Sequence, residues 1–244
     1  VPELGQQQVS IRLDGALQDE VQLNGTLQGA LTGSLQARLQ PLLAALPASL
    51  ELALNKLELD GLLPEDMTVE SIGLSAGGSL EQGFAWRLES ALQARQQAFA
   101  LAGNGNAGVS GALIEQLRLT HADSGHVRIQ ASADWTDSLS ASSTVSIESF
   151  PWQYLAGMDE APVQVDTAQL VFDYANDRYQ GSVQGSLQGP AGEFSIDSKL
   201  QGDAERARVE PLQITAGTGR VHGVLDAAWQ DAVSWAAALD IENL

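Results

Sequence analysis

The residues best suited to chemistry are three histidines and several close pairs of carboxylates. His121, His126 and His222 could ligate a metal ion or transfer protons, and Asp134 with Asp137 could act as an acid and a base. The spacing of the histidines gives no reason for them to converge on one ion. With 31 acidic residues in the chain, close carboxylate pairs arise by chance. We therefore predict histidines on the wet faces of strands, carboxylates that serve solubility, and neither a catalytic nor a metal site.

A glycine-rich stretch, residues 103–111, is the second place where chemistry could lie. Its sequence, GNGNAGVSG, resembles a dinucleotide-binding loop in glycine content but lacks the strand-and-helix context of such a loop. The sequence contains no nucleophile elbow and no phosphate-binding loop. We predict that residues 103–111 form a flexible hairpin loop, and that the chain is not an enzyme and binds no cofactor.

The elements that would have to position any site are strands. In residues 9–39, every odd position except Asp19 is apolar or glycine, and most even positions are polar. A period of two is typical of a strand with one apolar face. The run would span roughly 100 Å if it were one strand, so it must fold back. We predict a hairpin pair with a three-residue turn at residues 18–20, in which Leu17 pairs with Val21.

Similar strand-like stretches recur about every dozen residues to the end of the chain. The alternation shifts phase between Leu54 and the pair Leu57 and Leu59, which predicts a β-bulge. A proline and a glycine bracket residues 151–157, which predicts a short helix there. The predicted fold class is all-β, with elongated, curled antiparallel sheets that form a U-shaped, β-taco-like apolar groove and one or two short helical turns.

The chain also repeats itself at long range. Residues 125–150 align without gaps with residues 219–244, and one residue of slippage extends the match to Ile114–Thr120 and Val209–Thr215. Stacked repeats of this kind build elongated proteins, because each unit covers the end of the next. We predict a first β-groove unit over residues 1–157, with a joint near 151–157, and a second unit over residues 158–244 that continues the same sheet.

The repeat places two tryptophans, Trp135 and Trp229, at equivalent strand ends. We interpret them as plugs that close one end of the apolar interior, with a gate that faces a ligand as the alternative.

Composition excludes several classes of partner. The chain has 12 basic against 31 acidic residues and a net charge of -19, so nucleic acid and anionic membrane surfaces are poor partners. It contains no cysteine, which excludes disulfides and thiolate metal sites. No apolar run is long enough to span a bilayer, and we expect any membrane anchor to lie outside this sequence.

The apolar face itself is the candidate site, because leucine, valine, alanine and glycine dominate it and only 5% of the chain is aromatic. Two such walls that did not interdigitate would leave space for acyl chains. The sequence leaves open whether this face is an open groove or a filled core. The predicted lining residues are Val9, Ile11, Leu13, Leu17, Val21, Leu23, Leu27, Leu31, Leu35, Val127, Ile129, Tyr179, Val183, Leu187, Phe194, Ile196, Val221 and Leu225.

Several strings in the second half are familiar. Residues 150–155 (FPWQYL), 178–182 (RYQGS), 189–192 (GPAG) and 219–225 (GRVHGVL), followed by Trp229 and Trp235, resemble the TamB family of AsmA-like proteins. The similarity is best over residues 113–244, and these strings are not catalytic motifs.

The resemblance implies an inner-membrane-anchored protein of the Gram-negative periplasm. It also implies a β-taco groove that moves phospholipid toward the outer membrane, and partnership with the outer-membrane barrel TamA through regions outside this sequence. We expect phospholipid acyl chains as the ligand and a role in outer-membrane biogenesis. The alternative is a periplasmic scaffold or chaperone that assists assembly of outer-membrane proteins without lipid transport.

Overall fold

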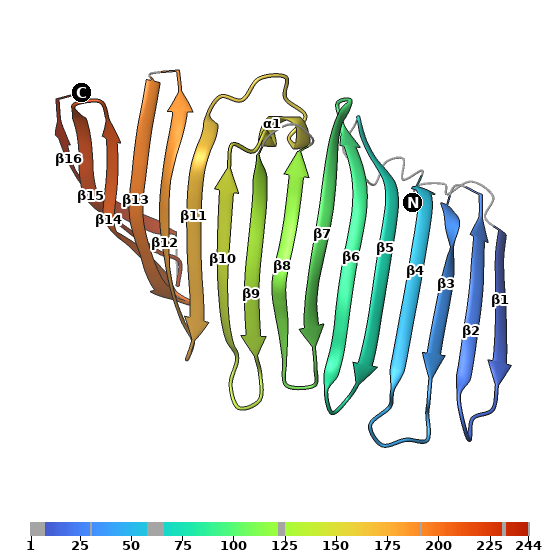
Figure 1. Cartoon of the computed structure of the whole chain (residues 1–244). Coiled ribbons are helices and arrows are strands. Elements are labelled where there is room, and N and C mark those ends of the chain that lie inside the picture. The colour runs from blue at the N-terminus through green and yellow to red at the C-terminus, as the bar shows by residue number, and fades with distance from the viewer. Residues whose placement is uncertain are drawn as a thin grey trace. The chain divides into compact units, whose positions relative to one another are not determined.

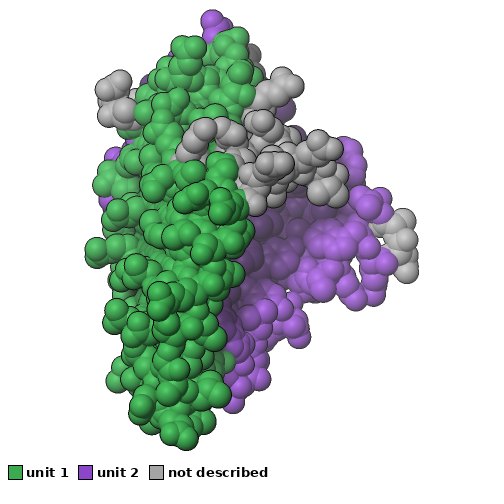
Figure 2. Space-filling view, turned by 90° about the vertical axis from the view of Figure 1, so that its right-hand side faces the viewer, with its two compact units in different colours: residues 1–123, 152–159 green, residues 124–151, 160–244 purple. Residues whose placement is uncertain are grey.

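The computed structural model describes residues 8–29, 31–57, 66–121, 125–190, 192–230 and 233–243. Leu59 of the predicted bulge lies outside these residues. The chain divides into two compact units, which Figure 2 distinguishes by colour. Unit 1 contains residues 1–123 and 152–159, and unit 2 contains residues 124–151 and 160–244. The predicted division at residue 157 into groove units stays a prediction.

The strands of unit 1 lie side by side in chain order, and each pairs antiparallel with the next (Figure 1). They are β1 (Gln8–Gly15), β2 (Val21–Gln28), β3 (Leu31–Leu39), β4 (Ala48–Leu57), β5 (Met67–Ser79), β6 (Gly83–Ala94), β7 (Gln97–Ala107) and β8 (Gly111–His121). The helix α1 (Trp152–Leu155) also belongs to this unit.

Unit 2 has the same construction, again with antiparallel neighbours in chain order (Figure 1). Its strands are β9 (His126–Asp134), β10 (Ser140–Glu148), β11 (Gln164–Ala175), β12 (Arg178–Gly189), β13 (Gly192–Asp203), β14 (Arg206–Ala216), β15 (Gly219–Ala228) and β16 (Ser234–Glu242). Most of the described residues are therefore in strands, and the predicted all-β antiparallel class is confirmed.

The first hairpin differs in detail from its prediction. Gly15, not Leu17, pairs with Val21, and the turn is correspondingly longer. Gly15 has a φ of 112°, and a Cβ there would lie 2.1 Å from the carbonyl oxygen of Glu20, so the reversal uses the conformational freedom of glycine. The shift is two residues, so the odd positions still share one face. The chain reverses a second time at Gly29, which has a φ of 133°. Residues 9–39 therefore form three strands, where the prediction had a single hairpin of two.

The predicted bulge near Leu57 is confirmed. Leu31 pairs with Leu57 and Thr32 pairs with Asn55, so one residue of β4 is left without a partner on β3. This extra residue moves the apolar column from even to odd positions.

Two further bulges support the internal repeat. In β8, the two residues between Ile114 and Leu117 face one residue of β7. In β14, the two residues between Val209 and Leu212 face one residue on each neighbouring strand. These are the segments that the sequence alignment pairs, so the two units share a bulge at equivalent positions.

The glycine-rich prediction was wrong for its first half. Strand β7 continues to Ala107, so Gly103 and Gly105 lie inside a strand opposite Leu88 and Trp86. Only the residues after Ala107 form the turn into β8. Neither glycine has a positive φ, so their role is to leave room for the side chains opposite them.

The predicted helix is confirmed. Helix α1 begins directly after Pro151 and spans Trp152–Leu155. Gly157 ends the turn with a φ of 72°, and the Met158 amide donates to the Gln153 carbonyl over 2.9 Å.

Candidate apolar ligand-binding face

One face of the unit 1 sheet is apolar. Residues paired across antiparallel strands point to the same side, so the strand register traces each face. One row across β1–β8 is Ile11, Gly25, Leu35, Leu52, Leu74, Leu88, Gly103 and Leu117. The row one residue away, on the opposite face, is Arg12, Asn24, Gln36, Glu51, Ser75, Arg87, Asn104 and Gln116. We call these the apolar face and the wet face of unit 1.

Unit 2 repeats the arrangement. Its apolar face includes the row Ile129, Val145, Leu170, Val183, Ser198, Leu212, Gly223 and Leu239. Its wet face includes the row Arg128, Ser146, Gln169, Gln184, Asp197, Gln213, His222 and Asp240.

The predicted lining residues lie on these two faces, with one exception. Leu17 lies in the β1–β2 turn and is 69% exposed. On the unit 1 face, Val9, Ile11 and Leu13 of β1 are more than half exposed. The predicted lining residues of β2 and β3 are half-buried, namely Val21, Leu23, Leu27, Leu31 and Leu35. On the unit 2 face, the half-buried set is Val127, Ile129, Tyr179, Val183, Leu187, Phe194, Ile196, Val221 and Leu225.

Sequence reasoning missed the lining of β4–β8. The apolar face there includes Leu54, Ile72, Ser90, Leu101 and Leu119 in one row. The bulges of β4, β5 and β8 change which parity is apolar, so no single column of odd positions could include these residues. The sequence did contain one signal for this lining, which is the two-residue spacing of Leu50, Leu52 and Leu54 in β4.

The apolar faces are only half-buried. Among the described residues, no large side chain is less than 2% exposed, and the buried apolar side chains are Leu57, Val69, Ala94, Phe99 and Phe150. A closed two-layer domain would bury such a face completely against a second layer. Most of each face is therefore shielded only in part, by neighbouring side chains of its own sheet.

Glycines opposite large side chains keep these faces smooth. Trp86 lies opposite Gly105, where a Cβ would come within 2.8 Å of its ring. Tyr179 lies opposite Gly202 in the same way, with its hydroxyl oxygen 2.5 Å from the position of such a Cβ. The large side chains thus lie flat over the backbone of the next strand, and the face has no ridge at these places.

The two predicted plugs stand at strand ends, as the repeat indicated. Trp135 follows β9 and Trp229 follows β15, with 44% and 43% of their surface exposed. The Trp229 indole N–H donates to the Ala204 carbonyl over 2.7 Å, and this bond ties it to the β13–β14 turn. Whether either side chain plugs or gates a groove stays a prediction.

The histidine prediction holds for His222 and fails for His121. His222 is exposed on the wet face of β15, opposite Asp240. His121 instead lies at the end of the apolar face of unit 1, with its ring centroid 5.1 Å from that of Phe99. An imidazole at the end of a strand can pack its ring on aromatics and direct one nitrogen to a polar partner, here Gln97 at 3.1 Å.

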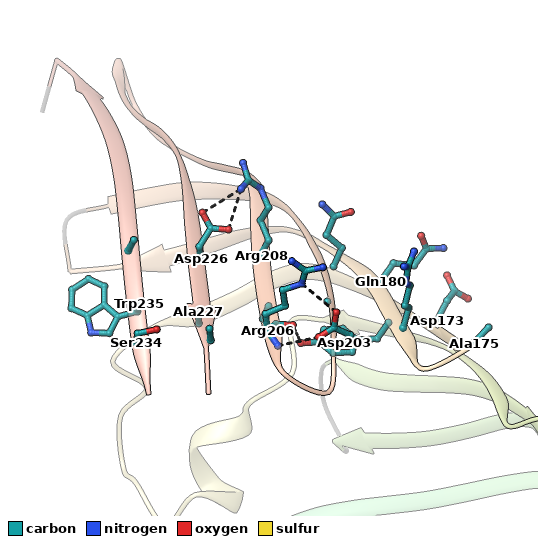
Figure 3. A pocket seen from close by; sticks show the side chains of 17 residues that line it. Asp173, Ala175, Gln180, Asp203, Arg206, Arg208, Asp226, Ala227, Ser234 and Trp235 are labelled. Carbon is teal, nitrogen blue, oxygen red and sulfur yellow. Dashed lines mark hydrogen bonds and ion pairs between the residues drawn. The ribbon is translucent and has the colours of Figure 1, made fainter. Parts of the chain in front are cut away.

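A cavity of about 930 Å³ lies in unit 2 and is lined by residues of both faces (Figure 3). Arg208 donates to Glu210 over 2.6 Å and to Asp226 over 3.1 Å, and these carboxylates raise its pKa. The backbone amide of Glu205 and the guanidinium of Arg206 donate to Asp203 and lower its pKa. Charges of both signs thus pair along the part of this cavity that the wet face lines.

Groups that could hold a metal ion, meaning three or more histidine, cysteine or acidic side chains together, are absent from the described residues. The described residues also contain no helix that is long and apolar enough to cross a membrane, since α1 has only four residues.

Open antiparallel sheets with one apolar and one wet face define a class of β-sheet proteins that present an extended apolar surface instead of a closed core. The chain belongs to the TamB family. The family model described as "TamB, N-terminal domain" matches residues 1–156 and again residues 149–244. Proteins of this family are components of a transport and assembly module. No curated protein matches the chain, and no solved structure does.

Proposed function

We propose that the apolar faces of units 1 and 2 hold the acyl chains of phospholipid, as a segment of a hydrophobic conduit between the inner and outer membranes. The half-exposed leucines, valines and isoleucines of these faces carry the proposal. Contact with water costs roughly 25 cal/mol for each Å² of apolar surface. An acyl chain laid on the face would remove that cost, and the flat side chains over glycine would give it a smooth surface.

Family membership supports the wider setting of the proposal. We infer a periplasmic location in a Gram-negative bacterium, an inner-membrane anchor for the whole protein, a role in outer-membrane biogenesis, and TamA as the partner barrel. The chemistry of this segment would then be binding alone, because family and sequence give no reason to expect catalysis.

Site-specific photo-crosslinking in cells tests which face holds lipid. Leu23 and Val183 are half-buried on the apolar faces, while their neighbours Gln22 and Gln184 are exposed on the wet faces. Crosslinkers at the first pair are expected to capture phospholipid, and crosslinkers at the second pair are expected to capture none. Equal capture on both faces would contradict the proposal. Capture of polypeptide at Leu23 and Val183 would favour the scaffold or chaperone alternative.

Lipid that co-purifies with the protein gives a second test. Leu23→Asp with Val183→Asp places two carboxylates on the apolar faces, and a buried charge costs several kcal/mol unless water reaches it. Mass spectrometry of organic extracts is expected to find less phospholipid than in the unaltered protein. The matched control is Gln22→Asp with Gln184→Asp, which adds the same charge to the wet faces and should leave the lipid content unchanged. Circular dichroism must show the same strand content in all three proteins.

A further inference from the structure

The buried apolar side chains of unit 1 gather along one margin of its sheet. Leu57 and Val69 are each 8% exposed, Ala94 is 1% exposed and Phe99 is 2% exposed. Leu57 pairs with Val69, Val69 with Leu92, Leu92 with Phe99, and Phe99 with His121. This row joins the ends of β4, β6 and β8 to the starts of β5 and β7. We call it the buried margin, and it contrasts with the half-exposed remainder of the same face.

The segment 152–159, which contains α1, is attached at this margin. The Tyr154 ring stacks on His121 with 6.2 Å between centroids and 25° between planes. His121 in turn packs on Phe99 and makes its polar contact with Gln97. The aromatic end of the segment therefore lies on the apolar side of β7 and β8.

A single arginine fastens the other end of the segment. Arg95 stands in the tight turn between β6 and β7, with a φ of 50°. Its Nη1 donates to the Gly157 carbonyl, and its Nη2 donates to Asp159 Oδ1 over 2.7 Å. One guanidinium thus holds both the glycine that ends the helical turn and the carboxylate two residues later.

This attachment is suited to reversible release. A helix as short as α1 is unstable by itself, so its position depends on contacts with the sheet. The Arg95 side chain is 28% exposed and that of Asp159 is 85% exposed, and ion pairs so open to water contribute little. Both ends of the segment continue into chain that belongs to unit 2, so the segment can leave the margin without unfolding any strand of unit 1.

We propose that residues 152–159 form a lid on the buried margin of unit 1, that Arg95 is its latch, and that opening the lid admits an apolar ligand to the face from this side. The ligand part of this inference rests on the proposed function, and the lid itself rests on the contacts of Arg95 and Tyr154. Neither Arg95 nor Tyr154 needs to touch the ligand, because both act by keeping the segment in place.

Hydrogen exchange and ligand kinetics on the full chain test the lid. Within the segment, the amides of Ala156 and Met158 donate to the carbonyls of Trp152 and Gln153 over 3.2 and 2.9 Å. Arg95→Ala is expected to speed exchange of these amides about fivefold, the scale of a lost exposed ion pair. It should raise the association rate of cis-parinaric acid, a fluorescent fatty acid, by a similar factor. Asp159→Asn keeps the bond to Gly157 and should give smaller changes of the same sign.

Arg87→Ala is the matched control, because it removes the same charge from β6 on the wet face. It should change neither rate. Unchanged exchange in Arg95→Ala would overturn the lid, and so would faster exchange with an unchanged association rate. If neither the unaltered protein nor any variant bound cis-parinaric acid, the proposed function would be overturned, and with it the ligand role of the lid. This result can be distinguished from unchanged hydrogen exchange, which would overturn the lid itself.

Discussion

Units 1 and 2 are built from the same alternation, yet they bury their apolar faces differently. Unit 1 buries Leu57, Val69, Ala94 and Phe99 along one margin. Among the described residues of unit 2, the buried apolar side chain is Phe150, which follows β10 and lies outside the strands of the face. On the apolar face of unit 2, Tyr179 and Leu225 are only half-buried. Alternation therefore fixes which side chains share a face, while segments such as 152–159 decide how much of that face meets water.

Removal of an aromatic ring from the buried margin of unit 1 should change the free energy of unfolding more than any other substitution proposed in this comparison. Phe99→Ala is expected to lower the free energy of unfolding by about 3 kcal/mol, because it leaves a cavity under His121 and Tyr154. In unit 2, Phe172 is 41% exposed, so Phe172→Ala should cost about 1 kcal/mol or less. Urea denaturation followed by circular dichroism measures both. Equal losses would mean that the two faces are equally closed.

A methyl group added to a face glycine should have a smaller effect. Gly105→Ala would place a Cβ 2.0 Å from the Leu113 carbonyl oxygen and 2.8 Å from the Trp86 ring. Overpacking of this kind typically costs about 1–3 kcal/mol, so the midpoint of urea unfolding should fall. Gly73→Ala is the control in the same unit, because its Cβ would meet only the Glu89 carbonyl oxygen at 3.9 Å. A control as unstable as Gly105→Ala would show that the flat packing over glycine is not the cause.

The smallest expected effect is a pH dependence confined to unit 2. The backbone amide of Glu205 and the side chain of Arg206 hold the pKa of Asp203 below its usual value of 3.8. A carboxylate with a lowered pKa in the folded state stabilises the protein above its unfolded pKa, and loses that contribution as the pH falls through the folded value. Asp203→Asn should therefore lower the unfolding midpoint at neutral pH, and the two proteins should converge below pH 3.8. A constant difference in midpoint at every pH would exclude this carboxylate as the cause.

Much of the fold was predictable because the local signals were strong. The alternation predicted the strands, the phase shift at Leu57 predicted a bulge, and Pro151 with Gly157 predicted the helix. The first turn was misplaced by two residues, because several glycines share the odd column and only their φ angles, positive at Gly15 and Gly29, distinguish those that turn. His121 was misplaced because its wet or apolar side depends on the bulge between Ile114 and Leu117.

The sequence by itself determined that this chain is an all-β protein with one apolar and one wet face, because a period of two assigns alternate side chains to opposite sides of any strand. It also determined the repeat that gives β8 and β14 the same bulge. The tertiary structure decided the rest of the lining in β4–β8, the flat packing of Trp86 over Gly105, and the return of residues 152–159 to the margin of unit 1. These features depend on strand register and on contacts between distant residues such as Arg95 and Asp159, which no local pattern encodes.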